Sequence, residues 1–126
     1  MGQFDFGNTI NLTITPVVSL YNDDRTSATF RINTIKSIAQ FFGGIYSPSM
    51  SLNTNWQDIC TFSSSDLPTL SETKYVDFGH QIIGDKSFTS RIKLNTDGTM
   101  TLQMKAYGNV TSQVYFNFNN ALIFYR

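Results

Sequence analysis

Side chains that could carry out chemistry are few in this sequence. His80 is the only histidine and Cys60 the only cysteine among 126 residues. A structural zinc site usually needs four such ligands, and a Cys–His nucleophilic pair would require these two residues to meet in the fold. Cys60 lies between the apolar residues Ile59 and Phe62 in the sequence, which favours a buried, inert thiol. We therefore expect no metal, no cofactor and no cysteine nucleophile.

Paired carboxylates are the second kind of reactive group to consider. Asp23 and Asp24 fall in a turn, where aspartate side chains cap their own backbone. A glycosidase needs two carboxyl groups held about 5 to 10 Å apart across a cleft. The aspartates left for such a role are Asp58, Asp66, Asp77 and Asp85. No Gly-x-Ser-x-Gly motif and no phosphate-binding glycine loop is present. We expect no enzyme, and a glycan hydrolase or esterase is the enzymatic alternative.

Binding chemistry is better represented than catalysis. Trp56 offers an indole on which the apolar face of a sugar stacks, or else it fills the core and its N–H finds one partner. Asp77 and His80 form a polar pair beside Gly79, which a plain surface loop explains equally well. Tyr46, Tyr75 and Tyr107 flank glycines or loops and are candidates for the lining of a groove. The candidate saccharide-binding residues are thus Trp56, Asp77, His80 and Tyr107.

Composition restricts the partners of this chain. Nine acidic and nine basic residues give a formal net charge of zero, and the basic residues form no run. Nucleic-acid-binding modules usually carry a basic patch, so we expect no nucleic acid partner. No apolar run approaches the roughly 20 residues of a membrane span, so we expect no membrane insertion. Charged residues make up only 14% of the chain, which suits contacts with saccharides or close packing against protein.

One segment of the sequence strongly predicts a β-hairpin, which would help to position the candidate binding residues. The segment from Arg91 to Met104 reads RIKLNTDGTMTLQM. Apolar and polar residues alternate on both sides of Asp97-Gly98, which places one row of side chains inward and the other outward. Asp-Gly between two such runs is typical of a tight turn, because glycine accepts a positive φ. The pattern predicts two antiparallel strands.

Similar alternation recurs about every ten residues, and no sustained amphipathic helix interrupts it. The predicted strands include 10–15, 28–33 and 114–119, and Pro16 places the first at a sheet edge or a bend. We expect 17–21 to be extended. Residues 35–46 have some helical spacing but end at Gly43-Gly44, so we expect a strand with a bulge at the glycines, followed by a turn at 47–49.

These elements predict an all-β fold, an antiparallel β-sandwich with a jelly-roll-like arrangement. The length suits one domain over 1–126, in which residues 1–8 are expected to be a flexible start or the edge of an excised domain. The chain start lacks the basic and apolar regions of a signal peptide. The 11 Phe and 6 Tyr residues can bury apolar area between copies as well as within one.

The order of these signals resembles a known family. Trp56-Gln57-Asp58-Ile59 is followed by Asp66-Leu67-Pro68, the segment 75–78, the stretch 91–99 and an aromatic strand at 114–118. This order is similar to that of the C-terminal head domains of tail-fibre and baseplate receptor-binding proteins from phages of Gram-positive bacteria, of lactococcal and streptococcal type. The likeness covers about residues 50–126. The Leu-Pro pair departs from the family pattern, since it continues here as Thr-Leu-Ser-Glu.

The resemblance implies a homotrimeric head that binds host cell-wall saccharide. Its partners would be that saccharide, two further copies of itself, and other baseplate or tail proteins. It implies a location at the tail tip or baseplate of the virion, after synthesis in the host bacterial cytoplasm. The alternative is a structural baseplate or tail-fibre module that makes only protein contacts.

Overall fold

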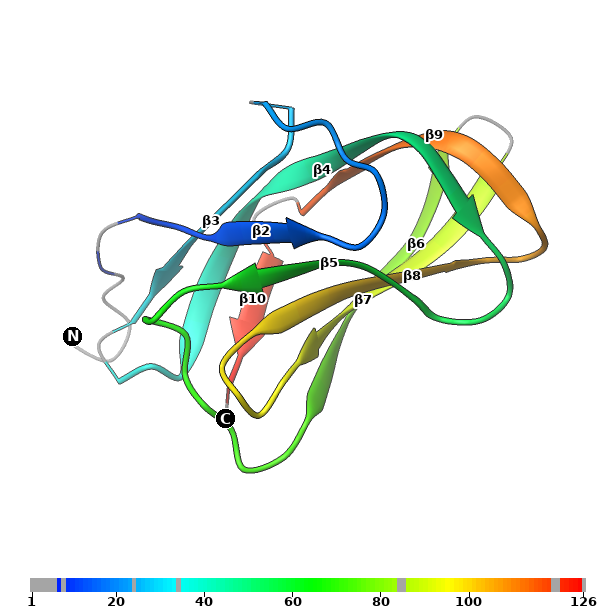
Figure 1. The fold of residues 1–126 in the computed structure, drawn as a ribbon. Coiled ribbons are helices and arrows are strands. Elements are labelled where there is room, and N and C mark those ends of the chain that lie inside the picture. Colours follow the sequence, from blue (N-terminus) through cyan, green and yellow to red (C-terminus); the bar gives the residue numbers. More distant parts are fainter. Residues whose placement is uncertain are drawn as a thin grey trace.

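Two antiparallel sheets pack face to face around a shared core (Figure 1). The computed structural model describes residues 7, 9–23, 25–33, 35–83, 86–118 and 121–125, with the side chains of 79–83 excepted. These described residues form ten strands and no helix. The strands are β1 (Ile10–Asn11), β2 (Thr13–Pro16), β3 (Ser27–Ile32), β4 (Ile38–Leu52), β5 (Gln57–Ser63), β6 (Lys74–Ile83), β7 (Lys86–Leu94), β8 (Met100–Ala106), β9 (Val110–Asn117) and β10 (Ala121–Phe124).

Each sheet contains five strands. The first has the order β1-β3-β4-β10, and β9 also pairs with β4; the second has the order β2-β5-β8-β7-β6. Every pairing is antiparallel. The predicted all-β antiparallel sandwich is therefore confirmed. Of the predicted start region 1–8, only residue 7 is described; residues 1–6 and 8 lie outside the described residues.

Strand β4 organises the first sheet because it is 15 residues long and pairs with three strands. Its beginning pairs with β3 along one edge and with β10 along the other, and its end pairs with β9. Gly43 and Gly44 lie where the pairing partner along one edge of β4 changes from β10 to β9. A Cβ on Gly43 would collide with the Ser27 carbonyl oxygen of β3, and one on Gly44 would collide with the Phe116 carbonyl oxygen of β9. The two glycines thus permit three backbones to approach closely.

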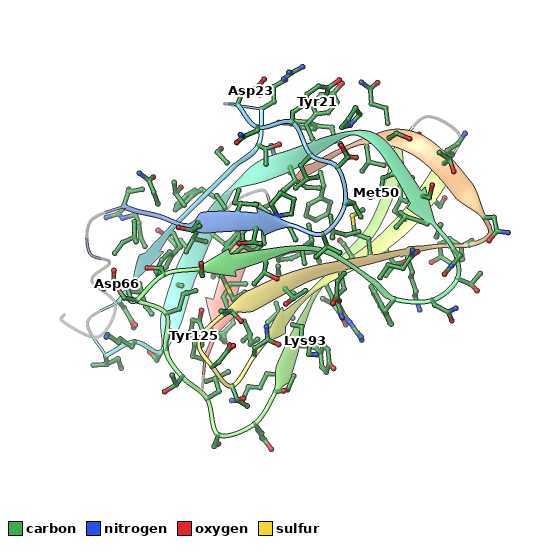
Figure 2. All side chains as sticks on the ribbon, viewed as in Figure 1. Tyr21, Asp23, Met50, Asp66, Lys93 and Tyr125 are labelled. Carbon is green, nitrogen blue, oxygen red and sulfur yellow. The ribbon has the colours of Figure 1, made fainter. Side chains whose placement is uncertain are left out.

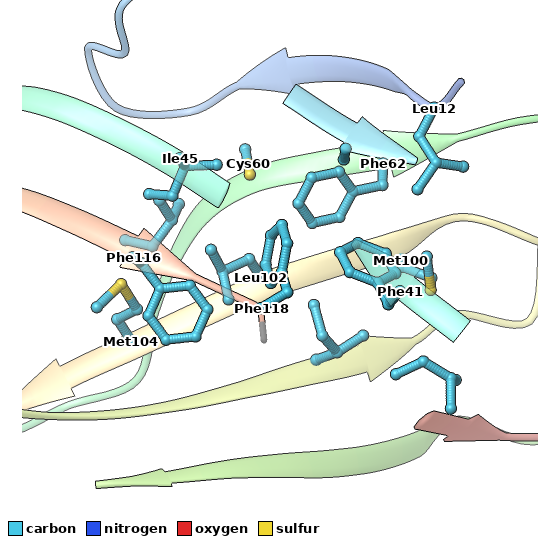
Figure 3. Close-up of a cluster of buried hydrophobic side chains, with 14 of the residues drawn as sticks. Leu12, Phe41, Ile45, Cys60, Phe62, Met100, Leu102, Met104, Phe116 and Phe118 are labelled. Carbon is cyan, nitrogen blue, oxygen red and sulfur yellow. The ribbon is translucent and has the colours of Figure 1, made fainter. Parts of the chain in front are cut away.

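Aromatic side chains from both sheets fill the centre of the core (Figure 3). Phe41 of β4 and Phe62 of β5 meet edge to face with ring centroids 5.2 Å apart. Phe118 contacts both of them, at 4.3 and 5.6 Å. Edge-to-face contacts of this kind add to the stabilisation that comes from burying the rings. The core therefore depends on side chains from both sheets.

The predicted hairpin is present as β7 and β8. Its loop has Gly98 at a φ of +90°, and the Asn95 N–H donates to the Thr99 carbonyl at 3.0 Å. The Asp97 carboxylate accepts hydrogen bonds from the hydroxyl and the backbone N–H of Thr99, at 2.7 and 3.0 Å. These bonds lower the pKa of Asp97 below its usual value. The hydrogen bonds of the turn and the alternation of the two strands therefore both favour this hairpin.

Three local predictions differ from the structure. Residues 17–21 form no strand, although Val17 and Val18 donate backbone hydrogen bonds to the Ile59 carbonyl. The strand expected at 35–46 is present from Ile38, but its register with β3 runs unbroken through Gly43 and Gly44. The irregularity lies instead between Ser47 and Met50, inside β4, where a turn was expected. A bulge there accommodates a proline, which has no N–H to donate to the ladder.

The close approach at Gly43 gives a stability prediction. The variant Gly43→Ala is expected to lower the free energy of unfolding by about 3 kcal/mol, because a Cβ meets backbone and the φ of +108° is strained for alanine. Urea denaturation monitored by tryptophan fluorescence measures the change. Gly108→Ala is the matched control, since a Cβ there has open space around it, and a change within about 0.5 kcal/mol is expected. Equal effects of the two variants would contradict this account of β4.

Candidate functional site

A row of polar side chains crosses the outer face of the second sheet. Asp58 of β5 is in register with Gln103 of β8, which is in register with Arg91 of β7. The Gln103 side-chain amide donates to Asp58 Oδ1 at 2.8 Å, and Arg91 Nε donates to Gln103 Oε1 at 2.7 Å. Asp77 of β6 is the register partner of Arg91 on the other side. The row therefore spans four neighbouring strands.

Arg91 lies between two aromatic rings on this face. Its guanidinium carbon is 4.1 Å from the ring centroid of Trp56 and 4.1 Å from that of Tyr75. The Lys105 ammonium lies 4.6 Å from the Trp56 centroid. Cations over aromatic faces at these distances are attracted by the ring quadrupole. We call Trp56, Tyr75, Arg91, Gln103 and Lys105 the arginine clamp.

The alternation of β7 explains why Arg91 points outward. Phe88, Ser90 and Ile92 are buried between the sheets, so Thr89 and Arg91 must project from the other side. Antiparallel registry with β8 then places the outward side chains of both strands next to one another. Local sequence fixes the direction of the arginine, and strand pairing fixes its neighbours.

Three of the four predicted saccharide-binding residues lie on this outer face. Trp56 is half-buried and is not part of the core; it precedes β5 and contacts the clamp cations. Asp77 is exposed, and no described residue forms a hydrogen bond or ion pair with its carboxylate. Tyr107 is 69% exposed, and its hydroxyl shares a hydrogen bond of 3.1 Å with Thr89. The backbone of His80 pairs with Thr89 in register, but its side chain lies outside the described residues.

Trp56 was expected to offer its ring to a sugar, but in the structure its ring also contacts protein cations. The guanidinium of Arg91 and the ammonium of Lys105 both lie over the indole, which holds these two charges on the outer face. Tyr75 and Tyr107 are 51% and 69% exposed, and their rings are more accessible to a stacking sugar. Sequence reasoning named Tyr75 as a candidate for the lining of a groove but did not single out Arg91. The outward position of Arg91 in the alternation of a predicted strand was the available signal, whereas the sequence did not show which strands lie side by side.

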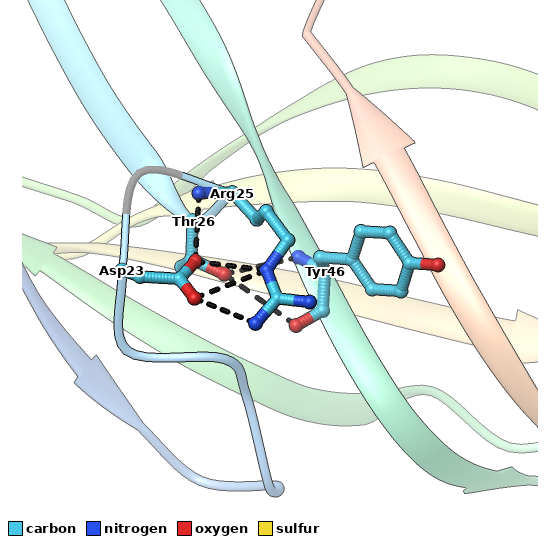
Figure 4. Close-up of polar contacts among 4 residues, drawn as sticks. All are labelled: Asp23, Arg25, Thr26 and Tyr46. Carbon is cyan, nitrogen blue, oxygen red and sulfur yellow. Dashed lines mark hydrogen bonds and ion pairs between the residues drawn. The ribbon is translucent and has the colours of Figure 1, made fainter.

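Arg25 is a second arginine that stacks on an aromatic ring, and Figure 4 shows it beside Asp23. The Arg25 guanidinium carbon is 3.6 Å from the Tyr21 centroid. Its nitrogens donate to both carboxylate oxygens of Asp23 at 2.6 to 3.1 Å, which lowers the pKa of Asp23. Figure 2 shows Tyr21 and Asp23 well away from Lys93 of β7. This arginine is therefore satisfied within its own turn.

A pocket in the described structure is separate from both arginines. A pocket of about 530 Å³ opens beside the Leu-Pro loop and the end of β10. It is lined by Ile35, Lys36, Leu67, Pro68, Thr69, Leu70 and Tyr125. Its walls are mainly apolar, and none of the predicted saccharide-binding residues lines it.

The described residues bring together few groups capable of catalysis or metal binding. Within the described residues, no three His, Cys, Asp or Glu side chains come together in a way that could hold a metal ion. Cys60 is buried in the core, and burial raises the pKa of its thiol to about 12. No helix in the described part of the chain is long and apolar enough to cross a membrane.

Comparison with known proteins did not identify the chain. No family model matches it, no curated protein matches it, and no solved structure matches it. The predicted site residues and function therefore remain predictions.

Burial of Cys60 makes a prediction for its reactivity. At pH 8 the native protein is expected to react with a thiol reagent at least about 100-fold more slowly than the unfolded chain, because the buried thiol stays protonated. The folded pKa is raised, so stability is fully present below the ordinary value of 9.0 and decreases as pH rises toward about 12. Reaction with Ellman's reagent and urea denaturation measure the two effects. Fast labelling of the native protein, or the same pH dependence in Cys60→Ala, would contradict this prediction.

Proposed function

We propose that this chain is a receptor-binding head domain of a phage tail or baseplate that adheres to saccharide on the host cell surface. The observation that supports the proposal is the outer face of the second sheet, where Arg91 is held between Trp56 and the exposed Tyr75, and Tyr107 adds another exposed ring. Aromatic rings contact the apolar faces of sugars, while amide, carboxylate and guanidinium groups bond their hydroxyls. The resemblance in the order of sequence motifs over about residues 50–126 supports the same function.

Binding at such an exposed face would be weak for one copy. Trp56, Tyr75 and Arg91 line neither of the two described pockets, so a sugar bound on this sheet surface would keep much of its hydration. Linking several copies raises the apparent affinity without any new contact. We therefore propose that the head acts as a homotrimer, located at the tail tip and attached to other tail or baseplate proteins.

Saccharide adhesion is tested by binding to glycan arrays and to purified Gram-positive cell walls. Tyr75→Ala and Tyr107→Ala are each expected to weaken binding about tenfold, equivalent to about 1.4 kcal/mol, because each removes an exposed ring from the face. Tyr115→Ala is the matched control, since Tyr115 is a similarly exposed tyrosine on β9 of the other sheet. Absence of binding to every glycan and every wall would overturn the proposed function.

A structural module that makes only protein contacts is the second candidate, and one observation favours it. Leu122 and Phe124 of β10 are 45% and 52% exposed on the outer face of the first sheet. Phe124 is in register with Ile38 of β4, which is only half-buried. Exposed apolar groups that adjoin one another commonly mark a protein interface.

Light scattering distinguishes the assembly states. The homotrimer predicts a mass of three times 14.2 kDa, and a monomer at micromolar concentration would contradict it. If the exposed Leu122 and Phe124 of β10 form the contact between copies, Phe124→Ser is expected to lower the mass of the assembly while leaving the circular dichroism spectrum unchanged. Tyr107→Ala, on the other sheet, is expected to leave the mass unchanged. A structural module would show the assembled mass but no glycan binding.

A further inference from the structure

The guanidinium of Arg91 is fixed in position, yet part of its hydrogen-bonding capacity is unused. Stacking on Trp56 and Tyr75 restricts the plane of the group, and the bond from Nε to Gln103 restricts its rotation. Gln103 is held in turn by Asp58. Among the described residues, no acceptor bonds the two terminal nitrogens of Arg91. An arginine presented in this way has already lost the conformational freedom that binding would otherwise cost.

Arg25 provides an internal comparison. It also stacks on a tyrosine, but Asp23 occupies its guanidinium with three hydrogen bonds. This is the only ion pair among the residues that the structure describes. The described residues therefore include two stacked arginines, Arg25 neutralised by a carboxylate of its own turn and Arg91 without a carboxylate bonded to it.

The charges around Arg91 favour an anion. Lys105 lies over the same indole as Arg91, which brings two positive charges to one ring. Lys93 is a third cation on the outward side of β7, on the opposite side of Arg91 from Lys105. The nearby carboxylates are Asp58, which bonds Gln103, and Asp77, which lies on the β6 side of Arg91. Cations therefore outnumber carboxylates on this face, and a bound anion would offset the repulsion between Arg91 and Lys105.

We propose that the arginine clamp binds an acidic group, a carboxylate or a phosphate, carried by the saccharide. This inference rests on the proposed function and names the chemistry that the site selects. The terminal nitrogens of Arg91 donate two parallel hydrogen bonds to the acidic group, and Lys105 contributes a further charge. Arginine forks match carboxylate and phosphate geometry, and such charge-assisted bonds are about twice as strong as neutral ones. The sugar ring that carries the group then lies against Tyr75 or Trp56.

A glycan array with matched ligands tests the proposal. The same oligosaccharide is presented in three forms: unmodified, oxidised to a carboxylate at C6, and phosphorylated at C6. The intact chain is expected to prefer an acidic form to the neutral form by about tenfold at low salt, and the preference is expected to shrink at about 0.5 M salt, where charges are screened. The two acidic forms distinguish a carboxylate ligand from a phosphate ligand.

Substitutions of Arg91 test whether the preference for acidic glycans depends on the arginine clamp. Arg91→Gln is expected to reduce the ratio of acidic to neutral binding to within about twofold, while Arg91→Lys retains part of it. Arg25→Gln is the matched control, because it removes an equally stacked arginine of the same charge and is expected to keep the full ratio. Circular dichroism checks that each variant is folded.

The outcomes separate this inference from the proposed function. Equal binding of neutral and acidic forms by the unaltered protein would overturn the acidic-group proposal and leave saccharide adhesion standing. An acidic preference that survives Arg91→Gln would also overturn it. Binding of none of the three forms, and of no other glycan or cell wall, would overturn both.

Discussion

Phe41, Phe62 and Phe118 meet edge to face at the centre of the sandwich, and the rest of the structure depends on this contact. Phe62 comes from the second sheet, while the other two belong to the first sheet or to the turn that follows β9. Because the rings interlock, the sheets cannot slide past one another without losing aromatic contacts. Each strand must therefore keep the register that points its apolar row at this centre.

The outer face of the second sheet follows from that inner constraint. A strand that buries one row of side chains exposes the other row, so the packing of Phe88 and Ile92 fixes the direction of Arg91. Registry across β5, β8 and β7 then aligns Asp58 and Gln103 with it. The position of the arginine clamp is thus a consequence of core packing. Small shifts in the core would move all of its members together.

The two outer faces differ in character, although both derive from the same alternation. The second sheet carries cations, amides and partly exposed rings, whereas β10 of the first sheet exposes Leu122 and Phe124. A single copy with these two surfaces can contact a polar ligand on one side and protein on the other. In the proposed adhesive head, ligand contact would lie on the second sheet and contact between copies on the first.

Sequence alone determined the fold class, the hairpin at Asp97-Gly98 and the burial of Cys60, because alternation and turn chemistry are local properties. It also brought attention to Trp56 and Tyr107, which lie on the outer face. It misplaced the irregularity of β4, because bulges are set by pairing with a distant strand. Only the tertiary structure decided that Arg91 lies between Trp56 and Tyr75. Those three residues are far apart in the chain, and their contact depends on strand order and register, which no local pattern encodes.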